Sequence, residues 1–463
     1  MVRRMRAGLA VVALILASCG SDGSTSSTST SGAVPTTSAT TTAEATTTAA
    51  ATTTAAATTA AATTVTALAL SPGTLDPSFG TNGLATVSPV LSGSAVPALA
   101  AAVAIDTDGR IVVAGEADVA EQRHVAIARL LPNGSPDEAF GERGSLVVDQ
   151  PGDANGLLLL DDGRMVITGT STDSGDGRAQ LLLAGFLEDG SPDVTFGTDG
   201  RAMVGCGLGH CSPVPPVRQS GGRIVIVATD ITNEQPFEGT IAVYGFDRNG
   251  RLVPNFGIGG ITQLGSGAAG AVALDASQRV VIVGATSDRK FVTRLSPNGT
   301  LDLSFGTNGI STFPLAEATD FWNAVTIDGD RIVVAGGRGE SDYSDELTLT
   351  RFDGEGRLDT RYGTAGTVGI PLTAMSYPAA VVADELGRAT VAGVSDGQFV
   401  VIRVDQTGRL DTTFGSRGIT LISFGGPGPD GATSMVADAD GQLAVGGYAF
   451  GTTYTFALIR LTS

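Results

Sequence analysis

Seven copies of one short signature predict an all-β fold, a seven-bladed β-propeller of four-stranded antiparallel blades preceded by a disordered N-terminal segment. The first copy reads LDPSFGTNG, with an aromatic residue, a glycine, two variable positions and a second glycine at its core. Successive aromatic residues lie 61, 56, 60, 49, 57 and 52 residues apart, a period that fits one blade. The 64 glycines and the low aromatic (5%) and charged (16%) fractions suit short strands joined by tight turns. The signatures occupy residues 75–83, 136–144, 192–200, 252–260, 301–309, 358–366 and 410–418.

Each unit contains four runs that we expect to be strands. In the first unit these are residues 84–90, 99–105, 110–115 and 124–130, bounded by turn residues. The second and third runs are almost continuously apolar, which predicts burial on both faces, as in a blade packed between two neighbours. The shortest spacing, 49 residues, leaves open a ring of six full blades and a partial one.

The N-terminal residues predict a targeting signal followed by a flexible tether. Residues 1–18 place three arginines before an apolar run, the layout of a signal peptide, and the run is too short to span a membrane. It ends in Leu-Ala-Ser-Cys, which resembles a bacterial lipobox and implies lipid attachment at Cys19; an ordinary signal peptide with a chance cysteine is the alternative. Residues 19–66 are nearly all Ser, Thr and Ala, which predicts a disordered tether, with the propeller over residues 67–463. We therefore expect an exported chain, lipid-anchored at the extracytoplasmic face of the cell membrane.

The signature itself predicts structure rather than chemistry. We expect its two glycines, Gly80 and Gly83 in the first copy, to permit a sharp crossover from one blade to the next. We expect its aromatic residue to be buried between adjacent blades. A ring of exposed aromatic residues that binds sugar or peptide is the alternative. The aromatic positions are Phe79, Phe140, Phe196, Phe256, Phe305, Tyr362 and Phe414.

An arginine near the end of the fourth run precedes the signature aspartate by eight residues in four units. We hypothesise that it folds back over the intervening turn and pairs with the aspartate. One unit has Gly245 and Val253 instead, and another has Gly185 followed by Asp193. Arg460 has no aspartate after it and Asp76 no arginine before it, so a closed ring predicts that these two pair. The predicted pairs are Arg129–Asp137, Arg294–Asp302, Arg351–Asp359, Arg403–Asp411 and Arg460–Asp76.

The repeated segments together resemble the delta-60 repeat family, also described as a β-propeller domain of unknown function, here in a bacterial lipoprotein. The matching sequence segments are LDPSFGTNG, LDLSFGTNG, DGRIVVAG, ARLLPNG and TRLSPNG, and the resemblance covers about residues 67–463. It implies a bacterial secreted or surface protein and carries no established activity.

Few side chains are candidates for chemistry. Cys206 and Cys211 are close enough to form a disulfide in an exported protein, and a metal site that adds His210 is the alternative. His124 is expected to be exposed at the start of a strand. Asp-rich turns such as 106–109 contain fragments of calcium loops without the distal glutamate, so we interpret them as turns. Trp322, the only tryptophan, is a possible ligand contact if it lies at the channel mouth. We predict no catalytic residue, cofactor or metal.

The charge of −19 disfavours nucleic acid and anionic membrane surfaces as partners, so we expect the membrane to be contacted only through Cys19. We expect a monomer that acts as a binding or scaffold module for an envelope protein or glycan. Specificity would lie in the loops between the third and fourth runs, residues 116–123, 171–179, 230–239 and 338–346. A polysaccharide hydrolase or lyase with carboxylates in the central funnel is the alternative, and the sequence does not decide between binding and catalysis.

Overall fold

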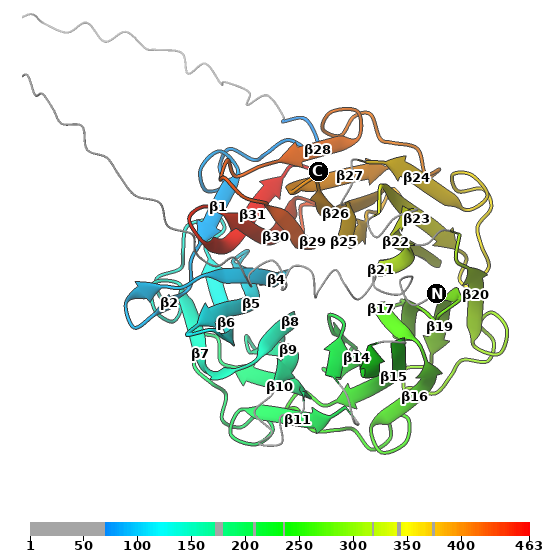
Figure 1. The fold of residues 1–463 in the computed structure, drawn as a ribbon, viewed down its shortest axis with the longest axis horizontal. Coiled ribbons are helices and arrows are strands. Elements are labelled where there is room, and N and C mark those ends of the chain that lie inside the picture. Colours follow the sequence, from blue (N-terminus) through cyan, green and yellow to red (C-terminus); the bar gives the residue numbers. More distant parts are fainter. Residues whose placement is uncertain are drawn as a thin grey trace, which may run out of the picture. The chain divides into compact units, whose positions relative to one another are not determined.

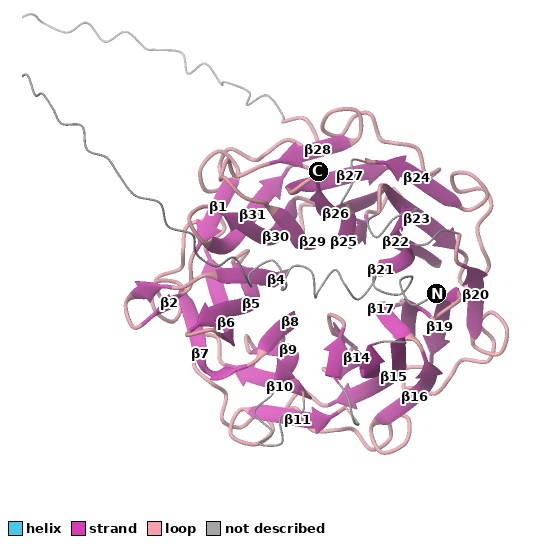
Figure 2. Cartoon of the chain, viewed as in Figure 1, coloured by secondary structure: helices cyan, strands magenta, loops and turns pink. Residues whose placement is uncertain are grey.

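The computed structural model describes residues 70–171, 179–206, 210–234, 237–316, 319–339, 344–372 and 376–463. These residues form a closed ring of seven blades (Figure 1), and their regular elements are all strands (Figure 2). The predicted seven-bladed, all-β fold is confirmed. No helix able to cross a membrane occurs in this part of the chain. The signal peptide, Cys19 and the tether lie outside the described residues.

Each blade is an antiparallel sheet with four strand positions, the first near the centre of the ring and the last at the rim (Figure 1). Blade 1 consists of β4 (Ala98–Ile105), β5 (Ile111–Val119), β6 (Gln122–Leu130) and β7 (Ser145–Pro151). Blade 2 consists of β8 (Asp153–Leu159), β9 (Met165–Ser171), β10 (Gln180–Phe186) and β11 (Arg201–Gly205). Blade 3 consists of β12 (His210–Pro213), β13 (Val217–Arg218), β14 (Ile224–Glu234), β15 (Phe237–Phe246) and β16 (Ile261–Ser266). In blade 3 two short strands that both pair with β14 occupy the first position, so this sheet has five strands. Blade 4 consists of β17 (Ala268–Leu274), β18 (Val280–Ala285), β19 (Arg289–Leu295) and β20 (Ile310–Pro314).

The remaining blades follow the same order. Blade 5 consists of β21 (Thr319–Asp328), β22 (Arg331–Gly339), β23 (Glu346–Phe352) and β24 (Thr367–Pro371). Blade 6 consists of β25 (Tyr377–Ala383), β26 (Ala389–Ser395), β27 (Gln398–Val404) and β28 (Ile419–Ile422). Blade 7 consists of β29 (Gly431–Ala437), β30 (Leu443–Phe450), β31 (Tyr454–Leu461) and β1 (Leu84–Val87), and a small hairpin of β2 (Val90–Leu91) and β3 (Ser94–Ala95) lies beside the ring.

The two ends of the described chain close the ring in blade 7. The outermost strand of this blade is β1, which pairs antiparallel with β31, with Leu84 opposite Ile459. The sequence-based units, which joined residues 84–90 to the three runs that follow them, were therefore offset by one strand. Blade 4 is complete, so the six-blade alternative is wrong. The short spacing there reflects a link of one residue, Gly267, before the blade and a turn of three residues between β18 and β19.

Antiparallel pairing puts the connections of each blade alternately on the two faces of the ring. The turn from first to second strand and the signature loop from third to fourth strand share one face, which we name the signature face. The turn from second to third strand and the link to the next blade share the other, which we name the hairpin face. In blade 1 the predicted loop 116–123 is wrong: β5 and β6 continue through it to a two-residue turn at Ala120 and Glu121, both with positive φ.

The core lies between neighbouring blades. The middle strands are buried along consecutive residues, as in Val280–Gly284 of β18, because each blade is covered on both faces. Side chains from blades 1 and 2, for example Val112 and Ile127 with Ile167 and Leu182, form one such layer. This confirms the burial inferred from the uninterrupted apolar runs.

Candidate functional site

The signature loop joins the third and fourth strands of a single blade. In blade 1 it connects β6 to β7, which pair with each other with Ala128 opposite Ser145. The predicted crossover between blades is therefore wrong. The crossovers lie on the hairpin face, and between β7 and β8 a single residue, Gly152, makes the link.

The signature nevertheless makes the contact between blades. Phe79 is fully buried, and the Gly80 N–H donates to Asn133 O of blade 1 at 2.7 Å. The ring of Phe79 packs on Gly134, where an added Cβ would lie 2.9 Å from Phe79 Cε2 and the φ of +82° also favours glycine. All seven aromatic side chains are at most 1% exposed, so they form no exposed binding ring. The other aromatic–glycine contacts are Phe140–Gly190, Phe196–Gly250, Phe256–Gly299, Phe305–Gly356, Tyr362–Gly408 and Phe414–Gly73.

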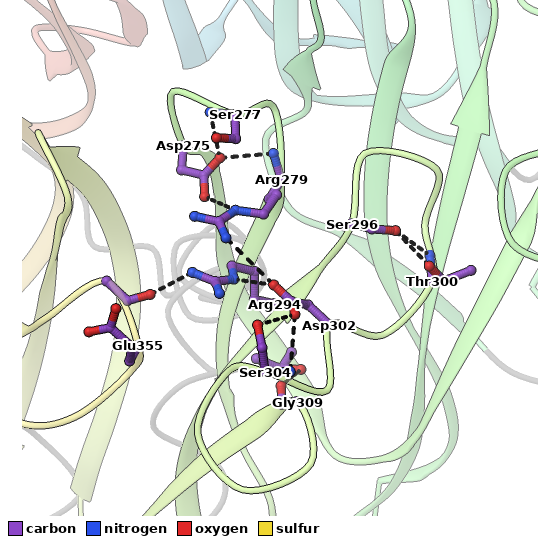
Figure 3. Close-up of polar contacts among 12 residues, drawn as sticks. Asp275, Ser277, Arg279, Arg294, Ser296, Thr300, Asp302, Ser304, Gly309 and Glu355 are labelled. Atoms are coloured by element: carbon purple, nitrogen blue, oxygen red, sulfur yellow. Dashed lines mark hydrogen bonds and ion pairs between the residues drawn. The ribbon is translucent and has the colours of Figure 1, made fainter.

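An arginine completes this contact, as Figure 3 shows for blade 4. Arg294 Nε lies 2.8 Å from Asp302 Oδ2, its Nη1 donates to Gly354 O of blade 5 at 2.5 Å, and its guanidinium lies 4.6 Å from the Phe305 ring centroid. The arginine thus pairs with its own aspartate, eight residues later, and also reaches the next blade. The other four predicted pairs are also within ion-pair distance: Arg129–Asp137 at 2.7 Å, Arg351–Asp359 at 2.8 Å, Arg403–Asp411 at 2.8 Å and Arg460–Asp76 at 2.6 Å.

Five of the signature aspartates are held in the ionised form. Burial disfavours the charge of Asp302, but hydrogen bonds from the Ser304 hydroxyl and N–H and from Arg294 outweigh burial and lower its pKa. The pKa values of Asp76, Asp193, Asp359 and Asp411 are lowered in the same way.

Blade 2 lacks the arginine at Gly185, and an arginine from another turn replaces it. Arg164, which follows the turn between β8 and β9, donates from Nη1 to Asp193 Oδ2 at 2.9 Å and to Asn249 Oδ1 of blade 3 at 3.2 Å. Arg164 was not among the residues predicted from the sequence. Its signal was available, because an arginine follows the same turn in six units: Arg110, Arg164, Arg223, Arg279, Arg331 and Arg388.

Blade 3 has lost both partners of the pair, at Gly245 and Val253. Arg223 enters from the equivalent turn, lies 5.8 Å from the Phe256 ring centroid and donates to Pro297 O of blade 4 at 2.8 Å. Its Nη1 also lies 3.1 Å from Gln219 Oε1, and no carboxylate of the described residues is within ion-pair distance of it. A cavity of about 530 Å³ opens at this place on the signature face. Its lining includes Gln219, Arg223, Arg248, Val253, Gln278 and Pro297.

A second group of charges lies on the hairpin face between blades 1 and 2. Arg123 Nη1 is 3.7 Å from Glu116 Oε2 and 3.8 Å from Asp153 Oδ1. Burial and the charge of Asp153 raise the pKa of Glu116 to about 7, although Arg123 opposes this. The adjacent His124 is buried with Nδ1 2.8 Å from Val148 O, so its predicted exposure is wrong.

Trp322 lies inside the wall between blades 4 and 5. It is 4% exposed and packs edge-on against Phe352 at 5.5 Å, so this structure gives it no surface at a channel mouth. Lys290, the only lysine in the sequence, lies 4.7 Å from the indole centroid and 2.5 Å from Asp320 Oδ1. Burial lowers the pKa of Lys290, and Asp320 opposes this effect.

The remaining candidates have structural roles. Cys206 and Cys211 form a disulfide with their Cα atoms 5.6 Å apart, which removes both thiols from the alternative metal site. Within the described ranges, no group of three or more metal-ligating side chains occurs. In the turn at Asp106, Oδ1 accepts the N–H groups of Asp108 and Arg110, and Oδ2 accepts Arg110 Nε. These contacts explain the aspartate without calcium.

Comparison with known proteins agrees on the fold and gives no activity. Residues 107–140, 160–196 and 279–305 match the family described as "Domain of unknown function (DUF5122) beta-propeller". Each stretch runs from the first turn of a blade to its signature aromatic residue, in blades 1, 2 and 4. No curated protein matches the sequence.

Three similar solved structures are a polysaccharide lyase, a virginiamycin B lyase and a puromycin hydrolase. Polysaccharide lyase Uly1 has 8% identity and a TM-score of 0.46, with 81% of this chain and 93% of that chain covered. An inactive virginiamycin B lyase from Staphylococcus aureus has 9% identity and a TM-score of 0.43, with 81% and 98% covered. Puromycin hydrolase has 14% identity and a TM-score of 0.44, with 80% of this chain covered; the match spans about half (54%) of that chain.

Proposed function

We propose that this chain is a binding or scaffold module of the cell envelope, held at the extracytoplasmic face of the membrane by lipid on Cys19. The observation that carries the binding role is the cavity of blade 3. Six blades fill the equivalent position with a carboxylate and an arginine, which stabilise the ring. Blade 3 leaves a recess of about 530 Å³ with the Arg223 charge beside it, so this position is open to a ligand.

The binding role is tested with the full-length chain, immobilised and exposed to solubilised envelope proteins and to a glycan array. We expect retention of a defined protein or glycan without its chemical change. If nothing is retained beyond a denatured control, the binding role is wrong.

The anchor is tested separately: labelled palmitate should enter the wild-type chain but not Cys19→Ala, and equal labelling of the two would contradict lipidation at Cys19.

A second candidate function, a polysaccharide hydrolase or lyase, has one observation in its favour. Glu116 and Asp153 lie 3.7 and 3.8 Å from the same atom, Arg123 Nη1, and the pKa of about 7 suits Glu116 to proton transfer near neutral pH. Turnover of envelope polysaccharides that is lost in Glu116→Gln would favour this enzyme. Turnover that is unchanged in that variant would exclude Glu116 as the acid or base, and retention without turnover would favour the binding module.

A further inference from the structure

Six blades show how this fold holds a carboxylate. In each, one aspartate oxygen faces an arginine and the other accepts the backbone N–H two residues later, as in Asp302 with Arg294 and Ser304. The same N–H contact occurs in the other five blades at 2.9 to 3.2 Å: Ser78 to Asp76, Ala139 to Asp137, Thr195 to Asp193, Arg361 to Asp359 and Thr413 to Asp411. The receptor that all six blades share is therefore one guanidinium plus one main-chain N–H. In blades 4 and 6 a second arginine, Arg279 or Arg388, also lies 3.7 Å from the aspartate.

Blade 3 keeps the backbone of this receptor. The Val253 N–H donates to Gly245 O at 2.8 Å, as the Asp302 N–H does to Arg294 O at 2.9 Å. The Phe256 N–H donates to Val253 O at 2.9 Å, as the Phe305 N–H does to Asp302 O at 3.0 Å. Because the loop has the same hydrogen bonds, the place that an aspartate carboxylate would occupy is defined even though the residue is valine.

Blade 3 also keeps both donors. Arg223 supplies the guanidinium over Phe256, and the N–H two residues after Val253 belongs to Asn255. This N–H belongs to an exposed residue outside the cavity lining, two positions after the lining residue Val253. Neither this N–H nor Arg223 Nε has an acceptor among the residues that the structure describes. The receptor thus has donors for a carboxylate and lacks the carboxylate.

The other charges that line the cavity are already engaged. Among the described lining residues Asp247 is the only acidic one, and Asp247 Oδ1 accepts the N–H groups of Asn249 and Arg251 at 2.9 Å each. Arg248 Nη2 lies 2.6 Å from Asp162 Oδ2. Arg223 is therefore the lining cation without an ionic partner in the described part of the chain, and it favours an anion.

We propose that this cavity binds a carboxylate group of a small ligand, in the place that the signature aspartate occupies in the other six blades. The carboxylate accepts from the Arg223 guanidinium and from the Asn255 N–H. The inference rests on the proposed binding function and names the class of ligand. An aspartyl side chain and a sugar acid share this chemistry, so both are used as probes.

The test measures binding to the full-length protein by calorimetry. The probes are N-acetylaspartate methylamide and glucuronate, with N-acetylasparagine methylamide and glucose as their uncharged counterparts. We expect each acid to bind at least tenfold more tightly than its counterpart, and the tighter acid identifies the source of the carboxylate. Equal binding of acid and counterpart would overturn the proposal.

The matched variant is Val253→Asp, which supplies the missing carboxylate from the chain itself. We expect Val253→Asp to raise the melting temperature without ligand and to weaken binding of the acids at least tenfold. Arg223→Gln should weaken binding without raising the melting temperature. If Val253→Asp binds the acids as the wild-type chain does, the site is elsewhere and the proposal is wrong.

The two proposals fail differently. If an envelope partner is retained equally by the wild-type chain and by Val253→Asp, and neither acid binds, then the carboxylate site is wrong and the binding function stands. If the acids bind and Val253→Asp abolishes this binding, but no envelope protein or glycan is retained, then the carboxylate site stands and the envelope function is wrong.

Discussion

Closure of the ring can be tested at Arg460, because this side chain joins the two ends of the propeller. Arg460 Nε and Nη2 lie 2.7 and 2.6 Å from Asp76 Oδ2, and Nη2 lies 3.0 Å from Ser78 Oγ. Its Nη1 donates to Pro132 O of blade 1 at 2.6 Å. Replacing Arg460 by methionine keeps an apolar stem over Phe79 and removes the charge and all of these bonds.

The expected loss follows from the carboxylate that remains. The Asp76 side chain is 8% exposed, and removing one partner of a buried ion pair costs about 3–5 kcal/mol. The Ser78 N–H and hydroxyl still donate to Asp76 Oδ1, and the Arg460 side chain is partly exposed, so we expect the low end, about 3 kcal/mol. Adding Asp76→Asn to Arg460→Met removes the unpaired charge and should recover about 1–2 kcal/mol.

Urea unfolding measures these differences, with circular dichroism for the sheets and the fluorescence of buried Trp322 as a second probe. Arg357→Met is the control, because Arg357 is 75% exposed and its nearest carboxylates are 3.8 Å away. We expect it to change the free energy of unfolding by less than about 0.5 kcal/mol. An equally small change in Arg460→Met, or a double variant no more stable than Arg460→Met alone, would refute the proposed role in closure.

Three further predictions concern other parts of the ring. Burial and Asp153 raise the pKa of Glu116 from 4.5 to about 7 in the folded state, so ionised Glu116 lowers the stability of the wild-type protein increasingly as the pH rises from 4.5 to 7. Glu116→Gln should therefore match the wild-type stability at pH 4 and exceed it at pH 8 by up to about 3 kcal/mol. A difference in stability that does not change with pH would contradict the raised pKa. Phe305→Ala should lower the free energy of unfolding by about 3–5 kcal/mol in urea, and a loss below 1 kcal/mol would contradict its role between blades. Replacing both Cys206 and Cys211 by alanine should lower the free energy of unfolding by about 2 kcal/mol under non-reducing conditions, since the disulfide closes a short loop. Under reducing conditions the variant and the wild-type protein should be equally stable. A difference that persists under reduction would assign the effect to packing.

The sequence predicted the blades better than it predicted how they connect. Period, turns and apolar runs located nearly all the strands, because each of these signals is local. Whether residues 84–90 pair with the run before the signature or with the run after it depends on contacts between distant parts of the chain. In blade 7 the partners are β1 and β31, separated by nearly the whole propeller. A repeat can be divided into units at any phase, so the period alone could not place the boundary between blades.

The Arg–Asp spacing of eight residues was informative because both residues flank one turn. The spacing placed Asp302 beside Arg294, and a closed ring then required Asp76 beside Arg460. It did not reveal Arg164, whose partner Asp193 lies 29 residues later and is reached across a different turn. Replacement of one arginine by another from a separate turn is visible only when the two turns are known to share a face.

The glycines of blades 2 and 3 explain why this replacement took the same form twice. A Cβ at Gly185 would lie 2.6 Å from Phe196 Cβ, and one at Gly245 would lie 2.4 Å from Phe256 Cγ, so the aromatic residue occupies the space of the missing side chain. The guanidinium must then come from the neighbouring turn, as it does from Arg164 and Arg223. Blade 2 kept Asp193 and its arginine remains paired, whereas blade 3 did not keep its aspartate. The cavity of blade 3 thus lies where the carboxylate is missing and the arginine is present, which is why Val253→Asp is the change that separates a ligand site from a packing defect.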